Sequence, residues 1–358
     1  SIINKRIKFI MAYTTINNSK LYQNTMLYTG DDGTRNITES GTFQADLVWL
    51  KRRNSAASHH LVDSVRGATK AIYSNATGAE ATDSTGVTGF VTDGFSLGGQ
   101  GGYNNNGDTF VSWTWKANGQ GSSNTDGSIN TTYTSVNTTA GFSICKWTGS
   151  GANATIGHGL GAVPKMIIVK NTSTTDSWMV YHVGSGSNAY LHLETTNAAL
   201  SPSTAQFQAT TPTSSFFYVG TADGTNKSSS NMIAYCFAEK QGYSKMGIYT
   251  GNGSTTNNAF IYTGFKPSWF MCKRTDGAGS WAMFDNKRET FNDGNNSSFF
   301  ADSNDAENVN DYNVEFFSNG IKTNASSDNI GRSGGTYLYM AFAEAPLVGT
   351  NNTPCTAR

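Results

Sequence analysis

The chain has 358 residues, of which 25 are basic, 25 are acidic and 39 are glycine, so its formal net charge is zero. The lack of a basic excess argues against a nucleic-acid-binding protein. No apolar run of the sequence approaches the roughly 18 residues of a membrane-spanning helix, so we expect neither nucleic acid nor membrane among its partners.

Residues 1–26 are predicted to form an N-terminal arm. The first ten are basic but lack the apolar stretch, about 7–15 residues long, that defines a signal peptide. Because Met11 is followed by a Thr- and Asn-rich coil, we expect the natural protein to begin near Met11. Leu21, Tyr22 and Met26 give the arm apolar side chains for docking on the first domain or on a neighbouring subunit.

A short apolar strand closed by a lysine occurs three times along the chain, each time after a turn containing Gly or Pro. Runs of this length, rich in β-branched and aromatic residues, favour fully buried strands over helices. The three copies are residues 46–51, 165–170 and 268–273, and their closing residues are Lys51, Lys170 and Lys273.

Other landmarks recur at nearly constant distances from these lysines. An aromatic-Thr-Gly turn precedes each lysine by 21 or 22 residues, counted from its glycine. The residues that follow each lysine by 12 positions, at the end of a strand-like run, are Asp63, His182 and Asp285. An alternating closing strand ends 64, 67 and 69 residues after the lysines at Trp115, Phe237 and Phe342. This constant order predicts three divergent copies of one domain of about 100 residues.

The predicted fold is all-β, with three tandem antiparallel β-sandwich repeats of jelly-roll or lectin-like type. Apolar residues do not sustain a helical period, and Gly, Asn and Asp turns separate the strands. We place the repeats at residues 27–117, 141–239 and 240–345, with a polar tail at 346–358.

Residues 118–140 are rich in Ser, Thr, Asn and Gly, which is typical of a flexible linker. The junction at residues 240–245 is too short for a free tether. We therefore expect the second and third repeats to hold a fixed relation, with the first repeat offset from them.

The four cysteines lack the spacing of a metal site or a redox motif. Three lie in apolar strands and one lies in the tail, so we expect free and mostly buried thiols. Such thiols suit assembly in a reducing cytoplasm. They are Cys145, Cys236, Cys272 and Cys355.

Two equivalent positions carry an aspartate three residues before an arginine. The pairs are Asp63 with Arg66 and Asp285 with Arg288, whereas the second repeat has His182 in the aspartate position. A carboxylate oriented by a guanidinium can serve in an acid/base or binding site. We favour the alternative, in which the pair supports a strand end and its loop, because one copy has lost it.

Other chemistries lack their sequence patterns. His59 and His60 are adjacent and point to opposite faces of a strand, so they cannot chelate one metal ion together. No phosphate-binding loop and no nucleophile elbow occurs. An acidic loop at residues 302–305 lacks the bidentate glutamate of a calcium site. We expect no cofactor and no metal ion.

With these landmarks in place, the chain resembles a family of repeated β-domains found in structural proteins of marine bacteriophages, including tail fibres and other virion-surface proteins. The resemblance covers the chain from Met11 onward, and the second repeat fits it least well. It implies a virion component with no established catalytic residues. The segments that carry it are residues 11–16, 46–51, 63–67, 94–97, 113–117, 249–253 and 340–346.

The expected function is therefore structural and non-enzymatic: a fibre or capsid-decorating protein, assembled in the host cytoplasm and exposed on the virion. Its partners would be capsid or tail proteins, and by analogy with fibres we expect a homo-oligomer, such as a trimer. Through the arm or the first repeat it would attach to the particle, while the second and third repeats project outward.

Two alternatives stay open. A lectin-like module would bind host glycans through exposed aromatic rings, and the candidate rings are Tyr73, Tyr103, Tyr181, Tyr190 and Tyr312. A polysaccharide hydrolase would need two carboxylates at glycosidase spacing, with Asp63 and Asp285 as the candidates.

Overall fold

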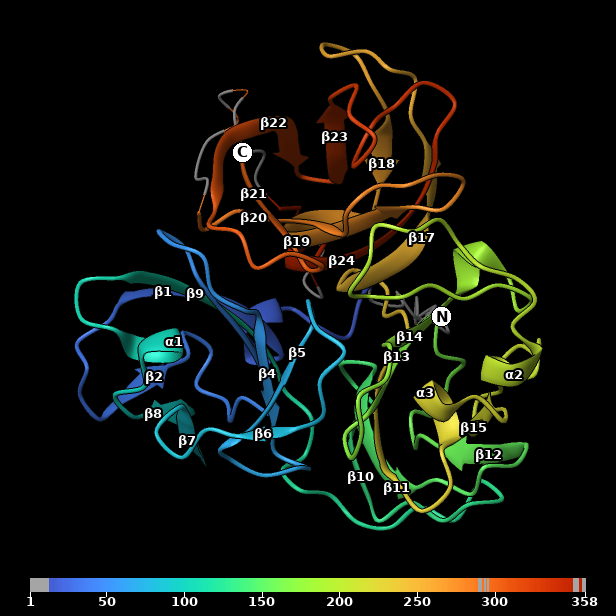
Figure 1. The fold of residues 1–358 in the computed structure, drawn as a ribbon. Coiled ribbons are helices and arrows are strands. Elements are labelled where there is room, and N and C mark those ends of the chain that lie inside the picture. Colours follow the sequence, from blue (N-terminus) through green and yellow to red (C-terminus); the bar gives the residue numbers. More distant parts are fainter. Residues whose placement is uncertain (1–12, 289–291, 293, 295, 350–353, 356–358) are drawn as a thin grey trace, which may run out of the picture.

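The computed structural model describes residues 13–288, 292, 294, 296–349 and 354–355, so the expected start near Met11 lies outside the described residues. The fold is all-β, as predicted, and every pairing between its named strands is antiparallel. Figure 1 shows three lobes around a common centre. The short helices are η1 (Ser19–Leu21), α1 (Gly101–Asn104), η2 (Val183–Ser185), α2 (Thr204–Phe207) and α3 (Asp223–Asn226).

The first lobe contains a six-stranded sheet, in the order β1-β9-β3-β4-β5-β6, and a three-stranded sheet, in the order β2-β8-β7. Thr92 and Asp93 form the tight turn between β7 and β8, and Gly94 begins β8, where the sequence predicts a hairpin. The strands are β1 (Gln23–Thr29), β2 (Arg35–Thr38), β3 (Leu47–Arg52), β4 (His60–Asp63), β5 (Lys70–Tyr73), β6 (Ala81–Thr82), β7 (Val87–Val91), β8 (Gly94–Leu97) and β9 (Thr109–Trp115).

The second lobe contains a five-stranded sheet, in the order β10-β11-β16-β13-β14, and a two-stranded sheet of β12 and β15. Helices α2 and α3 pack against β15 and β13. The strands are β10 (Tyr133–Asn137), β11 (Phe142–Thr148), β12 (Ala154–Gly157), β13 (Met166–Asn171), β14 (Met179–His182), β15 (Phe216–Val219) and β16 (Asn231–Phe237).

The third lobe is one eight-stranded sheet, in the order β17-β24-β19-β20-β21-β22-β23-β18, which curls into a nearly closed, barrel-like form. Asn319 and Gly320 lie at the predicted hairpin turn between β22 and β23. The strands are β17 (Ser244–Thr250), β18 (Phe260–Tyr262), β19 (Phe265–Arg274), β20 (Ala282–Asp285), β21 (Asn296–Phe300), β22 (Asn308–Phe317), β23 (Gly320–Asn324) and β24 (Thr336–Pro346).

The three large sheets share one order of four strands. The order is β1-β9-β3-β4 in the first lobe, β11-β16-β13-β14 in the second and β17-β24-β19-β20 in the third. The strand closed by a lysine is third in each order. Within it, Trp49 pairs with Trp113, Ile168 with Tyr235 and Met271 with Met340. Corresponding positions in the three lobes can therefore be compared residue by residue.

Each lysine-closed strand is buried on both faces. In β3, Val48 and Leu50 pack into a core that belongs to the first lobe, whereas Leu47 and Trp49 point the other way, into a core built by all three lobes. Side chains of a strand alternate between its two faces, so burial on both faces explains why these strands are continuously apolar. The second and third lobes likewise have cores of their own.

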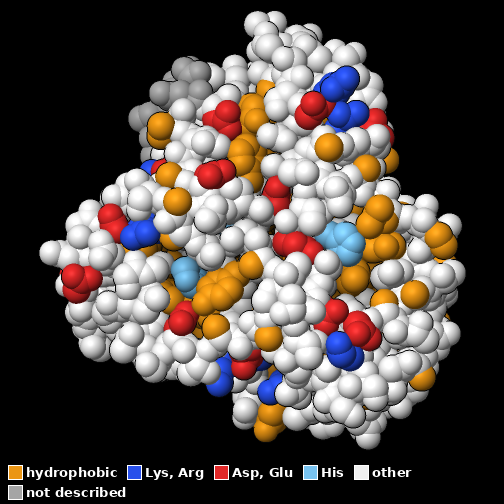
Figure 2. Space-filling view, in the orientation of Figure 1, with side chains coloured by type: hydrophobic (Ala, Val, Ile, Leu, Met, Phe, Trp, Pro, Cys, Tyr) orange, Lys and Arg blue, Asp and Glu red, His pale blue; other side chains and the backbone are white. Residues whose placement is uncertain are grey.

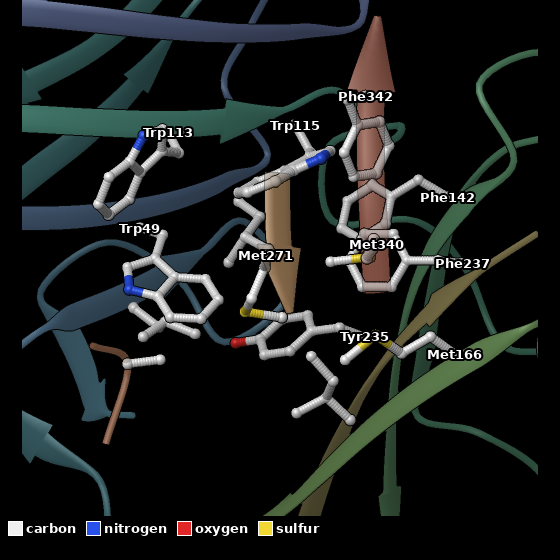
Figure 3. Close-up of a cluster of buried hydrophobic side chains, with 14 of the residues drawn as sticks. Trp49, Trp113, Trp115, Phe142, Met166, Tyr235, Phe237, Met271, Met340 and Phe342 are labelled. Carbon is white, nitrogen blue, oxygen red and sulfur yellow. The ribbon is translucent and has the colours of Figure 1, made fainter. Parts of the chain in front are cut away.

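The core built by all three lobes, called here the shared core, is centred on large aromatic and sulfur-containing side chains (Figure 3). Trp115, Phe237 and Phe342 occupy equivalent positions and meet there, with ring centroids 5.7 to 6.3 Å apart. Other members in Figure 3 are Trp49, Trp113, Phe142, Met166, Tyr235, Met271 and Met340.

The expected flexible linker and offset first lobe differ from the structure. Within residues 118–140, β10 pairs with β11, and the Asn118 N–H donates to Ser135 Oγ at 2.8 Å. Serine and threonine suggest flexibility by composition, but they also fit the edge of a sheet. Because Trp115 lies in the shared core, the first lobe packs directly against the other two.

The N-terminal arm also differs from its predicted course. The expected boundary after residue 26 falls inside β1, and the preceding segment crosses to the third lobe. There the Tyr13 hydroxyl donates to the Gly264 carbonyl at 2.5 Å, and Thr14 Oγ1 donates to the Gln241 carbonyl at 2.7 Å. Ile16 is buried in the shared core, so the arm fastens lobes of one chain together.

Truncating an aromatic of the shared core is expected to destabilise the whole molecule. Phe342→Ala removes a ring that contacts two other lobes, and a cavity of this kind costs about 3–5 kcal/mol. Denaturant unfolding followed by tryptophan fluorescence would measure the loss. Val309→Ala, at a residue 69% exposed, is the matched control and should change the free energy of unfolding by less than about 0.5 kcal/mol. Equal effects of the two variants would contradict the shared core.

Candidate functional site

The three landmark lysines lie at the junctions between lobes and are fully buried. Lys51 of the first lobe donates to the Asn304 carbonyl of the third at 3.3 Å, and Lys170 of the second donates to the Thr77 carbonyl of the first at 3.0 Å. Lys273 of the third lobe completes the cycle by donating to the Thr196 and Asn197 carbonyls of the second, at 3.2 and 2.7 Å. Each lysine also donates to the carbonyl of the residue that follows it.

Burial lowers the pKa of all three lysines to about 8, because removal from water penalises the charged ammonium group. The carbonyl oxygens around each Nζ stabilise the charged form, since hydrogen bonds from an ionised donor are strong. All three amines are held by backbone carbonyls and are closed off from solvent. These lysines therefore join lobes and have no access to a substrate.

Both predicted Asp–Arg pairs are present, and both are buried. The Arg66 Nε donates to Asp63 Oδ2 at 2.5 Å, and the Arg288 Nε donates to Asp285 Oδ2 at 2.6 Å. In each pair the other carboxylate oxygen accepts backbone N–H groups of the following turn. The pairs thus hold a strand end and its loop.

The same carboxylates also connect lobes. Asp63 Oδ2 accepts a hydrogen bond from the Tyr235 hydroxyl of the second lobe at 2.8 Å. Asp285 Oδ2 accepts one from Trp113 Nε1 of the first lobe at 3.0 Å. Burial would raise the pKa of Asp285, but Arg288 and the neighbouring donors keep that pKa below its ordinary value. Fully bonded, buried carboxylates are poorly suited to general acid/base work on an external substrate.

His182 takes the corresponding place in the second lobe. Its Nδ1 accepts from the Gly184 N–H at 2.9 Å, so Nε2 carries the proton and donates to the Tyr339 carbonyl of the third lobe at 3.1 Å. Burial lowers the pKa of His182 to about 4, so the ring is neutral near pH 7. The lysine bonds lead from the first lobe to the third, from the third to the second and from the second to the first. The bonds of Asp63, His182 and Asp285 lead in the opposite order, from the first lobe to the second, from the second to the third and from the third to the first.

Two tryptophans donate hydrogen bonds across the junctions between lobes, a role that the sequence did not predict. Trp178 Nε1 donates to the Tyr73 and Ala76 carbonyls, at 3.0 and 3.1 Å, and Trp281 Nε1 donates to the His192 carbonyl at 2.9 Å. Both stand four residues before the landmark His182 or Asp285. That repeated spacing marks the two tryptophans as equivalent, but it does not show whether their rings only pack or also donate hydrogen bonds.

The other candidate residues from the sequence make hydrogen bonds within the fold. No cluster of three His, Cys, Asp or Glu suited to a metal ion occurs among the described residues. In the acidic loop at residues 302–305, Asp302 Oδ1 accepts from the Trp281 N–H at 2.7 Å and Asp305 accepts from Ser303 at 2.6 Å. Within the part of the chain that the structure describes, no helix is long and apolar enough to cross a membrane.

The cysteines are free thiols, and three of them are buried.

The outer surface is polar with few charges, and Figure 2 shows charged side chains in small scattered groups over one face. Of the five candidate rings for glycan binding, Tyr103 and Tyr181 are buried, whereas Tyr73, Tyr190 and Tyr312 are partly exposed.

One open cleft of about 520 Å³ lies on the third lobe. Tyr312 lines it together with Asn308 and Asp311, whose carboxylate accepts a hydrogen bond from Ser298 at 2.5 Å. Burial raises the pKa of Asp311. A ring beside an amide and a carboxylate offers stacking and hydrogen bonding to a polar ligand.

Replacing a buried lysine should weaken the junction it makes. Lys170→Met leaves the Thr77 and Asp176 carbonyls without this donor, and the expected loss is about 2 kcal/mol at pH 7. Between pH 8 and 10.5 the unfolded chain binds a proton at Lys170 that the folded protein has released, so the wild type gains stability with rising pH. The difference between wild type and variant should therefore grow by up to about 3 kcal/mol across that range.

Urea unfolding of both proteins at several pH values would measure this difference. Because every other titrating group is common to the two proteins, its contribution cancels. Lys70→Met is the control, since Lys70 lies on β5 and bonds to Thr82 rather than to another lobe. A difference that stays constant with pH would contradict the burial of Lys170.

No curated protein matches this chain. Residues 18–346 match the family described as "Domain of unknown function (DUF7483)". The matched segment runs from η1 to the end of β24 and so takes in all three lobes. The chain therefore belongs to the DUF7483 family.

Proposed function

We propose that the chain is a non-enzymatic structural protein of a bacteriophage particle, exposed on the virion, whose lobes are three divergent copies of one β-sandwich unit. The observation that carries the proposal is that the landmark residues make contacts between lobes. The equivalent lysines, aromatic rings and strand-end polar groups of the three lobes all contact a neighbouring lobe. A chain whose recurring residues build a closed body acts through its outer surface.

The arrangement of the lobes favours a compact surface component over a rod. Three lobes that share one core lie around a centre (Figure 1), whereas domains of a fibre shaft follow one another along an axis. We therefore prefer a capsid-decorating or knob-like protein to a fibre shaft, with capsid or tail proteins as partners. Three lobes within one chain also supply a closed threefold arrangement without requiring a homotrimer.

Electron microscopy of purified virions labelled with an antibody against this chain would test the role. We expect label at regular positions on the particle surface and the intact chain among the virion proteins detected by mass spectrometry. An unrelated host protein of similar abundance serves as the control for carry-over. Absence of the chain from purified particles would remove the proposal.

A second candidate function is the binding of host-surface glycans, and the cleft lined by Tyr312 favours it. Aromatic rings stack on sugar faces, while amide and carboxylate groups bind hydroxyls. We expect binding on a glycan array to fall at least tenfold in an Asn308→Ala/Asp311→Ala variant. The control is Asn257→Ala, at an exposed loop position of the same lobe. No bound glycan, or equal binding by both variants, would exclude this cleft.

A further inference from the structure

Each lobe has one strand that is equivalent to β1, and only the second lobe covers that strand with another segment of the described chain. In the second lobe, β10 adds antiparallel to β11. In the first and third lobes, β1 and β17 are the end strands of their sheets. Edge strands carry unpaired N–H and C=O groups, to which an extended segment can add.

The backbone direction at these edges follows from the bonds at the strand ends. The Lys116 N–H donates to the Tyr22 carbonyl at 2.8 Å, and the Gly30 N–H donates to the Asp108 carbonyl at 2.8 Å, so even-numbered residues of β1 face β9. Backbone groups alternate along a strand. The odd-numbered Leu27 therefore turns its N–H and C=O away from β9, toward the open edge.

The covered edge shows what such a position binds. Lys146 of β11 corresponds to Leu27, since each stands three residues before the glycine of an aromatic-Thr-Gly turn. The Lys146 carbonyl accepts a hydrogen bond from the Thr132 N–H at 2.7 Å, next to β10. Among the described residues, the outward groups of Leu27 have no such partner, and its side chain is 39% exposed.

The edge of β1 borders a groove of about 310 Å³, and the charged residues described on its walls are both lysines. Lys20 and Lys287 lie on its walls, with Thr25 and Leu27 of β1 between them. Within the described residues neither lysine forms an ion pair, and the nearby Glu344 is paired with Lys266 at 3.3 Å. The hydroxyl of Thr25 is buried without a hydrogen-bond partner in the described chain.

The corresponding edge of β17 differs in charge. The Met246 N–H donates to Glu239 Oε1 at 2.7 Å, which places a carboxylate at that edge. The equivalent Thr25 N–H of β1 donates instead to the neutral amide oxygen of Asn24, at 3.1 Å. The Ile248 side chain is 55% exposed but lies against Gly184 of the second lobe, where an added Cβ would approach it to 2.3 Å. Of the two uncovered strands, β1 is therefore the one suited to an incoming segment, and its lysines select an acidic one.

We propose that β1 is the docking edge for an extended acidic segment of a partner protein, which adds antiparallel to β1 as β10 adds to β11. Main-chain hydrogen bonds to Leu27 would supply affinity, and carboxylates of the segment would pair with Lys20 and Lys287. This inference does not depend on the virion role, because it concerns the purified chain and an isolated segment.

Three labelled ten-residue peptides would test the proposal by fluorescence anisotropy with the purified full chain. One has the sequence of residues 129–138, which cover β11; the second carries Thr132→Glu and Thr134→Glu, and the third carries Thr132→Lys and Thr134→Lys. We expect the acidic peptide to bind at least tenfold more tightly than the basic one, with affinity that falls as salt rises. Lys20→Ser/Lys287→Ser should abolish the preference.

Leu27→Pro is the sharpest variant, since proline removes an N–H that faces outward and leaves the bonds to β9 in place. It should abolish binding of the acidic peptide, whereas Ile248→Pro on β17 should leave binding unchanged. Hydrogen exchange of the wild-type protein keeps the test independent of how the variants fold. There the Leu27 amide should exchange at least tenfold more slowly when the peptide is present.

Three results would overturn the proposal. The first is no binding of the acidic peptide at concentrations up to about 1 mM. The second is protection at β17 instead of β1. The third is self-association of the unliganded protein that Leu27→Pro abolishes in sedimentation, which would make a second copy of this chain the occupant.

Discussion

Burial of β3, β13 and β19 on both faces is the constraint on which the rest of the structure depends. One face of each strand fills the core of its own lobe, and the other fills the shared core. A lobe on its own would expose an apolar sheet face carrying rings such as Trp49 and Trp113 in the first lobe. Since full burial of one such side chain is worth about 1.5–3 kcal/mol, the lobes are expected to be stable together rather than as independent domains.

Closing three sheets around one core also buries polar groups. The junction bonds satisfy part of them, whereas Trp115 Nε1, Trp269 Nε1 and the Tyr243 hydroxyl have no hydrogen-bond partner among the described residues. An unsatisfied buried group costs about 1–3 kcal/mol, so each lysine that reaches a neighbouring carbonyl prevents such a loss. Strand-end bonds run one way around the molecule and lysine bonds run the other way. Each lobe is consequently fixed to both of its neighbours by hydrogen bonds as well as by apolar contact.

The exchange of aspartate for histidine in the second lobe has a physical reason at the same junction. Asp63 and Asp285 accept from Tyr235 and Trp113, which both have a donor in the side chain. The equivalent position in the third lobe is Met340, which has none. An aspartate facing it would be buried without that donor, whereas neutral His182 donates to the adjacent Tyr339 carbonyl instead. The departure in the second lobe is thus matched to the neighbour that it meets.

The sequence predicted the elements of the fold better than their assembly. The all-β class, the landmark strands and the hairpins at Gly94 and Gly320 follow from local patterns of apolar residues and turns. Repetition along a chain says that units recur, but not that they close around one another. Nothing in the sequence marked the lysine ending each apolar strand as buried, because enclosure of an amine by carbonyls of another lobe leaves no trace in the local sequence. Likewise, composition made residues 118–140 look flexible, although an open sheet edge lay beside them to receive β10.

Residues that differ among the three lobes are the better guide to what the molecule binds. Positions common to the three lobes are used in closing the body, so they are unavailable to partners. Leu27, Lys146 and Ile248 occupy equivalent places at sheet edges but meet different surroundings: an open groove with two lysines on its walls, a covering strand and a carboxylate-capped edge. Each lobe has to pack around the same shared core, so packing alone does not account for these differences at the sheet edges. A partner that recognises this protein would distinguish one lobe from the next at these edges, where the three lobes differ in charge and in accessibility.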